Sequence, residues 1–134
     1  MAFKIVKNPK AWWPVFIPGV TEDGTVVENS FEMRFRILDD DENRAVAAEM
    51  QTVAEEFDPT ATSESELAAQ LVEKIAEDWR SVEMEDPAGG DAAISLPFTP
   101  ENIRTVVKLP NAWDAIARAY RACRTATPEK RLGN

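Results

Sequence analysis

The chain has 134 residues, a hydrophobic content of 44% and a formal net charge of −9, values typical of a single globular domain. It has no histidine and one cysteine, Cys123, which excludes an intrachain disulfide and any nucleophile that needs a histidine base. No run approaches the roughly 20 apolar residues of a membrane-spanning helix. The N-terminal residues also lack the apolar core of a signal peptide, so we expect a cytoplasmic protein without membrane contacts.

The first predicted element is a long β-hairpin. Residues 12–17 and 31–37 each alternate between two faces, and the second run alternates strictly between apolar and polar side chains. The Asp-Gly pair at 23–24 suits the tight turn between them. Pro14 and Pro18 cannot donate to a neighbouring strand, so they either place the first strand at an edge of the sheet or break it. The apolar face must be covered by helices or by another subunit.

Two amphipathic helices are predicted next. The first, residues 41–57, begins in acidic residues that complement the helix dipole. The second is expected from Ser63 to Trp79, because Ser63 and Glu66 have the spacing of a capping box. The expected apolar faces contain Val46, Met50, Val53 and Phe57 in the first helix and Leu67, Leu71, Val72, Ile75 and Trp79 in the second.

An acidic spacer follows at residues 83–93, where one proline and two glycines predict no regular structure. The chain is expected to return to the core with Ile94, Leu96 and Phe98. Thr99 then supplies a capping hydroxyl before a proline, which is a strong helix start. This helix is expected to stop at Leu109-Pro110.

Asn111 is expected to cap a last helix, which carries two distinct faces. Its apolar stripe contains Trp113, Ile116, Ala117 and Tyr120, and its basic ridge contains Arg118, Arg121 and Arg124. Residues 1–125 are therefore predicted to form one domain, followed by a flexible tail at residues 126–134. The predicted class is α+β and predominantly helical, with the N-terminal β-hairpin packed against about four helices.

The start of the first predicted helix partly matches a calcium-binding loop. Asp39, Asp41 and Asn43 match three ligand positions of an EF-hand loop. Arg44 stands where that loop needs glycine, however, and Met50 stands where it needs a bidentate glutamate. A cluster of helix-capping acids is the better interpretation.

No catalytic pattern is convincing. Glu55, Glu56 and Asp58 are adjacent acids of the kind found on solvated surfaces, rather than a separated acid/base pair. Gly89-Gly90 lacks the context of a phosphate-binding loop. Cys123 has no partner base, which favours an incidental cysteine over a reactive thiol. We therefore predict a protein that is not an enzyme and has no cofactor or metal site.

The charges are unevenly distributed. Residues 39–91 carry seventeen acidic and three basic groups, a net charge of −14, whereas residues 92–134 carry a net charge of +4. Such an acidic middle repels phosphate backbones, so nucleic-acid binding is not expected. The acidity is either a solvated surface or a contact for a basic partner, for instance the basic C-terminal part of a second copy.

Some aromatic residues fall outside the expected core. Trp12 and Phe16 lie on the face of the first strand opposite Trp13, so that both faces are apolar. Internal packing is the default interpretation, and an exposed aromatic pair at a binding site is the alternative. The candidate partner-binding residues are Trp12, Phe16, Arg118, Arg121 and Arg124.

The order of short segments is also distinctive. The segments are Phe3-Lys4-Ile5-Val6, Trp12-Trp13-Pro14-Val15, SFEMRFRIL at residues 30–38, EDWRSV at residues 77–82, LPFTPEN at residues 96–102, and Pro110 to Tyr120 with its Ala-Arg-Ala-Tyr end. In this layout the chain resembles the tail assembly chaperones of long-tailed bacteriophages with non-contractile tails (siphophages). The resemblance covers most of residues 3–122, and the spacer here is longer and richer in alanine and glycine.

The resemblance implies a non-enzymatic protein that acts in the host cytoplasm and is absent from the finished tail. Such proteins bind and solubilise the tape-measure protein and help to recruit tail-tube subunits, often through a frameshifted longer form, and they self-associate. Two alternatives belong to other classes. One is an acidic DNA-mimicking inhibitor, and the other is a small enzyme, which would need a pocket with converging carboxylates.

Overall fold

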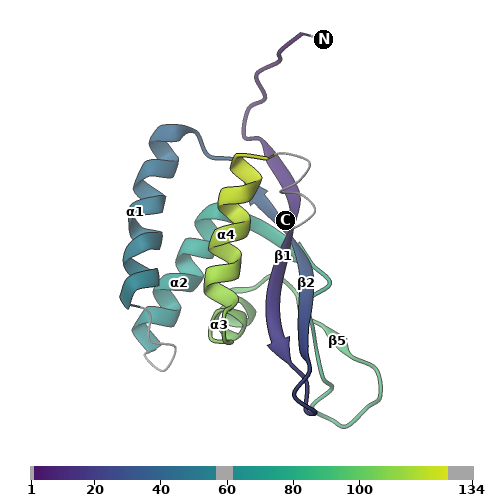
Figure 1. The fold of residues 1–134 in the computed structure, drawn as a ribbon. Coiled ribbons are helices and arrows are strands. Elements are labelled where there is room, and N and C mark those ends of the chain that lie inside the picture. The colour runs from purple at the N-terminus through teal and green to yellow at the C-terminus, as the bar shows by residue number, and fades with distance from the viewer. Residues whose placement is uncertain (1, 57–61, 127–134) are drawn as a thin grey trace.

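The structure is a computed structural model that describes residues 2–56 and 62–126, with side chains described for residues 2–52 and 65–126. It confirms a mixed α+β fold that opens with a β-hairpin (Figure 1). The elements are β1 (Lys10–Val20), β2 (Val26–Arg36), α1 (Asp40–Glu56), α2 (Thr62–Ile75), β3 (Ala76–Arg80), β4 (Glu83–Met84), β5 (Ile94–Ser95), α3 (Pro100–Val107) and α4 (Ala112–Arg124).

The hairpin forms as its sequence predicts. β1 and β2 pair antiparallel in unbroken register, from Lys10 opposite Arg36 to Val20 opposite Val26. Gly24, at φ +87°, supplies the left-handed residue of the turn between them. In the order β1-β2-β3, β1 is an edge strand, as its two prolines predicted.

One expected helix is shorter than predicted. α2 ends at Ile75, and residues 76–80 form β3, which pairs antiparallel with β2 and places Trp79 opposite Met33. The apolar spacing of Ile75 and Trp79 fits a helix, but β2 has a second edge whose backbone groups need partners. Pairing with that edge satisfies them and still buries Trp79, so the tertiary context outweighs the local pattern.

The segment after β3 also departs from expectation. β4 lies at the start of the stretch predicted to lack regular structure, and it pairs with β5, which directly follows that stretch. Ile94, in β5, is exposed rather than buried. Leu96 and Phe98 are the residues that pack against the core. With three strands beyond the hairpin, the finer prediction of a predominantly helical chain is not clearly supported.

The helix starts follow the sequence more closely. Asp39 accepts the amide N–H of Glu42 at 2.8 Å, which confirms the capping interpretation of the acidic cluster. Thr99 accepts the amide N–H of Asn102, with proline next in the chain. Asn111 occupies the N-cap position of α4, as predicted, but it sits at φ +67° and its side chain makes no capping hydrogen bond. The Ser63 side chain, Phe57, Asp58 and residues 127–134 lie outside what the structure describes.

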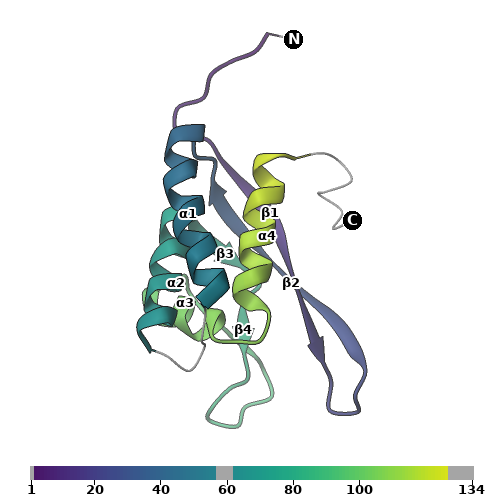
Figure 2. The ribbon, with the colours of Figure 1, turned by 60° about the vertical axis from the view of Figure 1, so that its left-hand side comes forward.

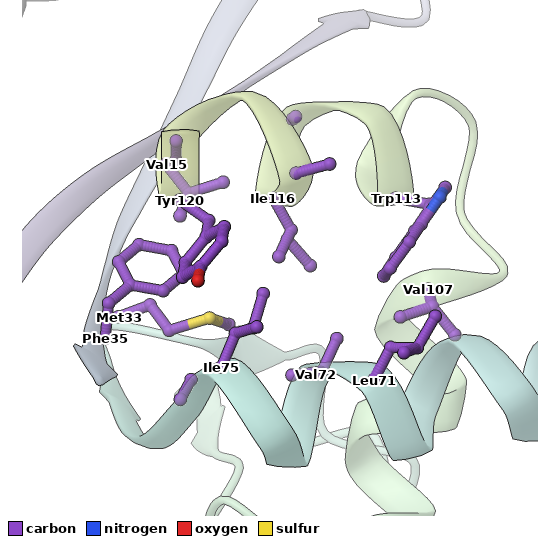
Figure 3. Packing of buried hydrophobic residues seen from close by; sticks show 14 of the residues in the cluster. Val15, Met33, Phe35, Leu71, Val72, Ile75, Val107, Trp113, Ile116 and Tyr120 are labelled. Carbon is purple, nitrogen blue, oxygen red and sulfur yellow. The ribbon is translucent and has the colours of Figure 1, made fainter. Parts of the chain in front are cut away.

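The four helices gather on one side of the β1-β2-β3 sheet (Figures 1 and 2). One continuous core joins the sheet to α2, α3 and α4 (Figure 3). Trp13, Trp79 and Trp113 are all buried in it, as their positions on apolar stripes predicted. Among the described residues, no helix combines the length and apolarity needed to cross a membrane.

Candidate functional site: a groove along helix α4

An open groove of about 930 Å³ runs beside α4. Its walls come from β1, including Pro14, Phe16 and Pro18, from α1, including Ala47 and Met50, and from most of the length of α4. The groove therefore joins segments that are distant in the sequence. α4 lies between α1 and β1 in the fold (Figure 1), and residues of these three elements line the groove.

Small side chains explain why this space remains open. α4 presents Ala115, Ala119 and Ala122 along the groove, and α1 presents Ala47. A methyl group cannot fill the space between neighbouring elements as a leucine would. The alanines also let α4 lie close to β1, so the helix covers the edge strand.

Tyr120 ties the two helical walls together. Its ring is buried against Phe35, and its hydroxyl donates to Asn43 Oδ1 of α1 at 2.6 Å. Burial raises the pKa of the Tyr120 phenol above its usual 10.0, so the hydroxyl stays a donor at neutral pH. This bond fixes the width of the groove at that point, because it spans from one helix to the other.

The three arginines of the predicted ridge all line the groove, but their environments differ. Arg124 is 18% exposed and donates to Leu38 O and to Asp40 Oδ1, both at 3.1 Å. Arg118 pairs with Asp114 one turn earlier on α4. Arg121 is exposed and forms no ion pair with any described residue. Arg124 thus anchors the start of α1, while Arg121 keeps its charge available beside the groove.

The structure therefore brings four of the five candidate residues together: Phe16, Arg118, Arg121 and Arg124. Phe16 is half-buried, with part of its ring open to the groove. Trp12 lies apart, on the outer face of the sheet, where the Arg80 guanidinium sits 4.2 Å from the centre of its ring. The roles of these residues in binding remain predictions.

Sequence reasoning missed the wall that α1 contributes. Ala47 and Met50 lie one turn apart on that helix, and Asn43 lies one turn before Ala47. The available signal was the recurrence of alanine on both helices, which permits an open channel but does not specify one.

The groove holds few groups suited to catalysis. Its acidic residues are Glu28 and Asp114, and Asp114 is already paired with Arg118. In the described part of the chain, no three potential metal ligands of the histidine, cysteine or acidic type cluster together. Cys123 is buried. The geometry is that of an apolar channel with a cationic border, which suits binding of a ligand or segment that is apolar on one side and acidic on the other.

Comparisons with protein-family models, with curated proteins and with solved structures found no match for this chain.

Proposed function

We propose that this is a non-enzymatic binding protein whose groove receives an amphipathic helix of another protein. The observation that carries the proposal is the meeting of apolar surface with an arginine that forms no ion pair among the described residues. Phe16, Pro18 and Met50 line the channel, and Arg121 stands beside it without an ion-pair partner among the described residues. A helix that places apolar residues along one side and acids beside them matches this arrangement.

The identity of the partner is supported by the resemblance to siphophage tail assembly chaperones. A tape-measure protein is long and helical, with extended apolar surface, and it needs a cover until the tail tube surrounds it. We propose that this chain supplies the cover in the host cytoplasm, is absent from the finished tail, and helps to recruit tail-tube subunits through a longer frameshifted product. The acidic outer surface, including the start of α1, would keep such a complex dissolved.

The groove can be blocked without touching the core. Ala47 and Ala48 are neighbours on α1, and both are exposed, but Ala47 lines the groove and Ala48 does not. Ala47→Trp should fill the channel, and Ala48→Trp is the matched control because it makes the same change to helix propensity and surface. We expect Ala47→Trp to weaken binding of a helical tape-measure segment at least tenfold, about 1.4 kcal/mol.

The readout is co-expression with a tape-measure segment that is insoluble alone, followed by co-purification and by calorimetry on the recovered complex. The wild-type protein and Ala48→Trp should hold the segment in solution, and Ala47→Trp should not. Equal solubility of the segment with and without the wild-type protein would overturn the chaperone function. Equal binding by the two tryptophan variants would show that the groove is not the site that binds the segment.

A charge test addresses the cationic border. Arg121→Glu should weaken binding and make it less sensitive to salt, whereas Lys108→Glu makes the same charge change at an exposed position outside the groove and should not. If the protein instead competes with DNA for a basic partner, and Arg121→Glu strengthens that competition, the acidic-mimic alternative would replace this proposal.

A further inference from the structure

Large apolar side chains are exposed at several places on the molecule, and two of these places carry opposite charges. The first is the N-terminal arm, residues 2–8, which precedes β1 and extends away from the body of the fold (Figures 1 and 2). Phe3 is 93% exposed and Ile5 is 86% exposed. The two residues are two positions apart, so in an extended segment they lie on the same face. An arm with this pattern is suited to strand pairing.

The second place is the β4–β5 hairpin. Met84 and Ile94 are directly opposite across its ladder, and they are 43% and 41% exposed. The ladder has two residues per strand and belongs to a separate two-stranded sheet. A hairpin of this size is marginal by itself in water, and its outer edges can accept another strand.

The two places have opposite charges. The arm carries Lys4 and Lys7, and neither forms an ion pair within the part of the chain that the structure describes. Residues 83–95 carry four acidic groups and no basic one, namely Glu83, Glu85, Asp86 and Asp91. On α4, by contrast, Arg118 and Arg124 already pair with acids of the same chain, and the third arginine, Arg121, lies beside the groove rather than on a strand that could pair. The arm is therefore the better basic match for the acidic hairpin.

The arm and the hairpin lie toward opposite ends of the molecule in both views (Figures 1 and 2). The arm leaves from the start of β1, whereas the hairpin lies on the side toward which β1 runs. A contact between them consequently suits two copies of the chain, each giving its arm to the next. Such an interface is heterologous, so it builds an open chain or a closed ring.

We propose that the arm of one copy adds as a strand to the β4–β5 hairpin of a second copy. Phe3 and Ile5 cover Met84 and Ile94, and Lys4 and Lys7 lie against the hairpin carboxylates. This inference goes beyond the groove and does not depend on which partner the groove binds. The net charges of the sequence pointed to the basic C-terminal part of a second copy as the partner of the acidic residues. The proposal places the basic partner in the N-terminal arm instead.

The first test measures the mass of the full chain, carrying any affinity tag at its C-terminus, by light scattering and sedimentation over a wide range of concentrations. The wild-type protein should form concentration-dependent assemblies that weaken as salt rises. Phe3→Ser with Ile5→Ser, and separately Met84→Ser with Ile94→Ser, should each weaken assembly by roughly 30-fold or more, as expected when anchor residues are removed.

The matched control is Val20→Ser with Val26→Ser. This pair is also exposed and also lies opposite across a ladder, at the tip of the β1–β2 hairpin. Its loss should leave assembly unchanged. A wild-type chain that stays monomeric at every concentration would overturn the proposal, and so would arm and hairpin variants that assemble like the wild type.

The second test mixes the two defective proteins. The arm variant retains a working hairpin, and the hairpin variant retains a working arm, so an equal mixture should yield a 1:1 dimer that cannot grow further. An isologous contact of arm with arm or hairpin with hairpin predicts no such rescue, and its absence contradicts the proposal. Both variants leave the groove intact and should still solubilise the tape-measure segment, so failure of assembly and failure of the chaperone function are separable.

Discussion

Two surfaces of this molecule combine an aromatic ring with arginine, and they differ in what is left unsatisfied. On the outer face of the sheet, Arg80 covers Trp12 and also pairs with Glu32 at 3.1 Å. In the groove, the ring of Phe16 is part open, and Arg121 has no ion-pair partner among the described residues. On the first surface, the ring and the guanidinium both have partners within the chain. The second presents apolar area and charge together, which is what a binding partner can use.

The comparison shows why residue type alone does not locate a binding site. Trp12 and Phe16 occupy the same face of one strand in the sequence pattern, yet Trp12 contacts Arg80 of β3, whereas Phe16 lines the groove together with residues of α4. The difference arises from the neighbours that folding supplies. Substitutions in the core and on each surface should therefore have different effects on stability and on binding.

The largest effect is expected for Trp79→Ala. Trp79 is buried, meets Phe31 and Phe98 edge to face, and donates its indole N–H to Leu96 O at 2.7 Å. Its removal should lower the free energy of unfolding by about 3–5 kcal/mol. Trp12→Ala, on the outer face, should cost about 1 kcal/mol, since it loses mainly the contact with Arg80. Denaturant unfolding measures both, and equal losses would contradict the assignment of the two tryptophans to core and surface.

Tyr120→Phe should have the next largest effect. The hydroxyl bonds Asn43 Oδ1 in a partly buried position, so its loss should cost about 1 kcal/mol in denaturant unfolding at neutral pH. Because the bond joins the two helical walls, the variant should also bind a groove ligand more weakly. An unchanged stability would show that water replaces the hydroxyl without cost.

The same substitution should also change how the free energy of unfolding depends on pH. Burial raises the pKa of Tyr120 in the folded state, so the unfolded chain ionises first as the pH rises above the usual value of 10.0. The stability from this group is present below that pH and is lost as the pH rises toward the folded-state pKa. Tyr120→Phe should reduce the alkaline loss of stability, measured by unfolding at a series of pH values, relative to the wild type.

A pair of arginine substitutions tests the comparison directly. Arg80→Ala should lower stability by up to about 1 kcal/mol, because Arg80 holds both a ring and a carboxylate, whereas Arg121→Ala should stay within about 0.5 kcal/mol. Binding of the groove ligand should show the reverse order, with Arg121→Ala weakened and Arg80→Ala unaffected. The same order in both measurements would mean that the two surfaces are not distinct in function.

Much of the fold follows from local signals. Strict alternation gave the hairpin, Pro14 placed β1 at an edge, and Thr99 marked the start of α3. These features depend on residues near one another in the chain. The tail and the single-domain boundary remain predictions.

What the sequence did not reveal depends on distant partners. Residues 76–80 became β3 because β2 had an unpaired edge, which is a property of another element. The groove combines β1 with α1 and α4. The ridge of three arginines contains one structural anchor, one paired side chain and one cation without an ion pair among the described residues. Charge patterning identified the ridge, but only the positions of Asp40 and Asp114 distinguish its members.

The smallest effect is expected in how the free energy of unfolding falls at acid pH. On the outer face, Glu77 of β3 pairs with Lys10 Nζ at 2.8 Å and with Arg34 Nε at 3.2 Å, which links all three strands. The hydrogen bond from Lys10 holds the pKa of Glu77 below its usual 4.5. A lowered folded-state pKa stabilises the fold above the unfolded-state pKa, and this contribution is lost as the pH falls through the folded-state value.

Glu77→Gln should therefore reduce the part of the acid-induced loss of stability that arises below pH 4.5, with little change in the shape of the curve above it. The effect should be small and should shrink with added salt, because the pairs are partly exposed. Glu73→Gln is the control, since Glu73 is exposed on α2 and forms no ion pair with a described residue. If both variants change the acid-induced loss of stability equally, general charge repulsion governs that loss rather than the ion pairs that link the three strands. The charged groups of the outer face would then not be specifically paired within the chain.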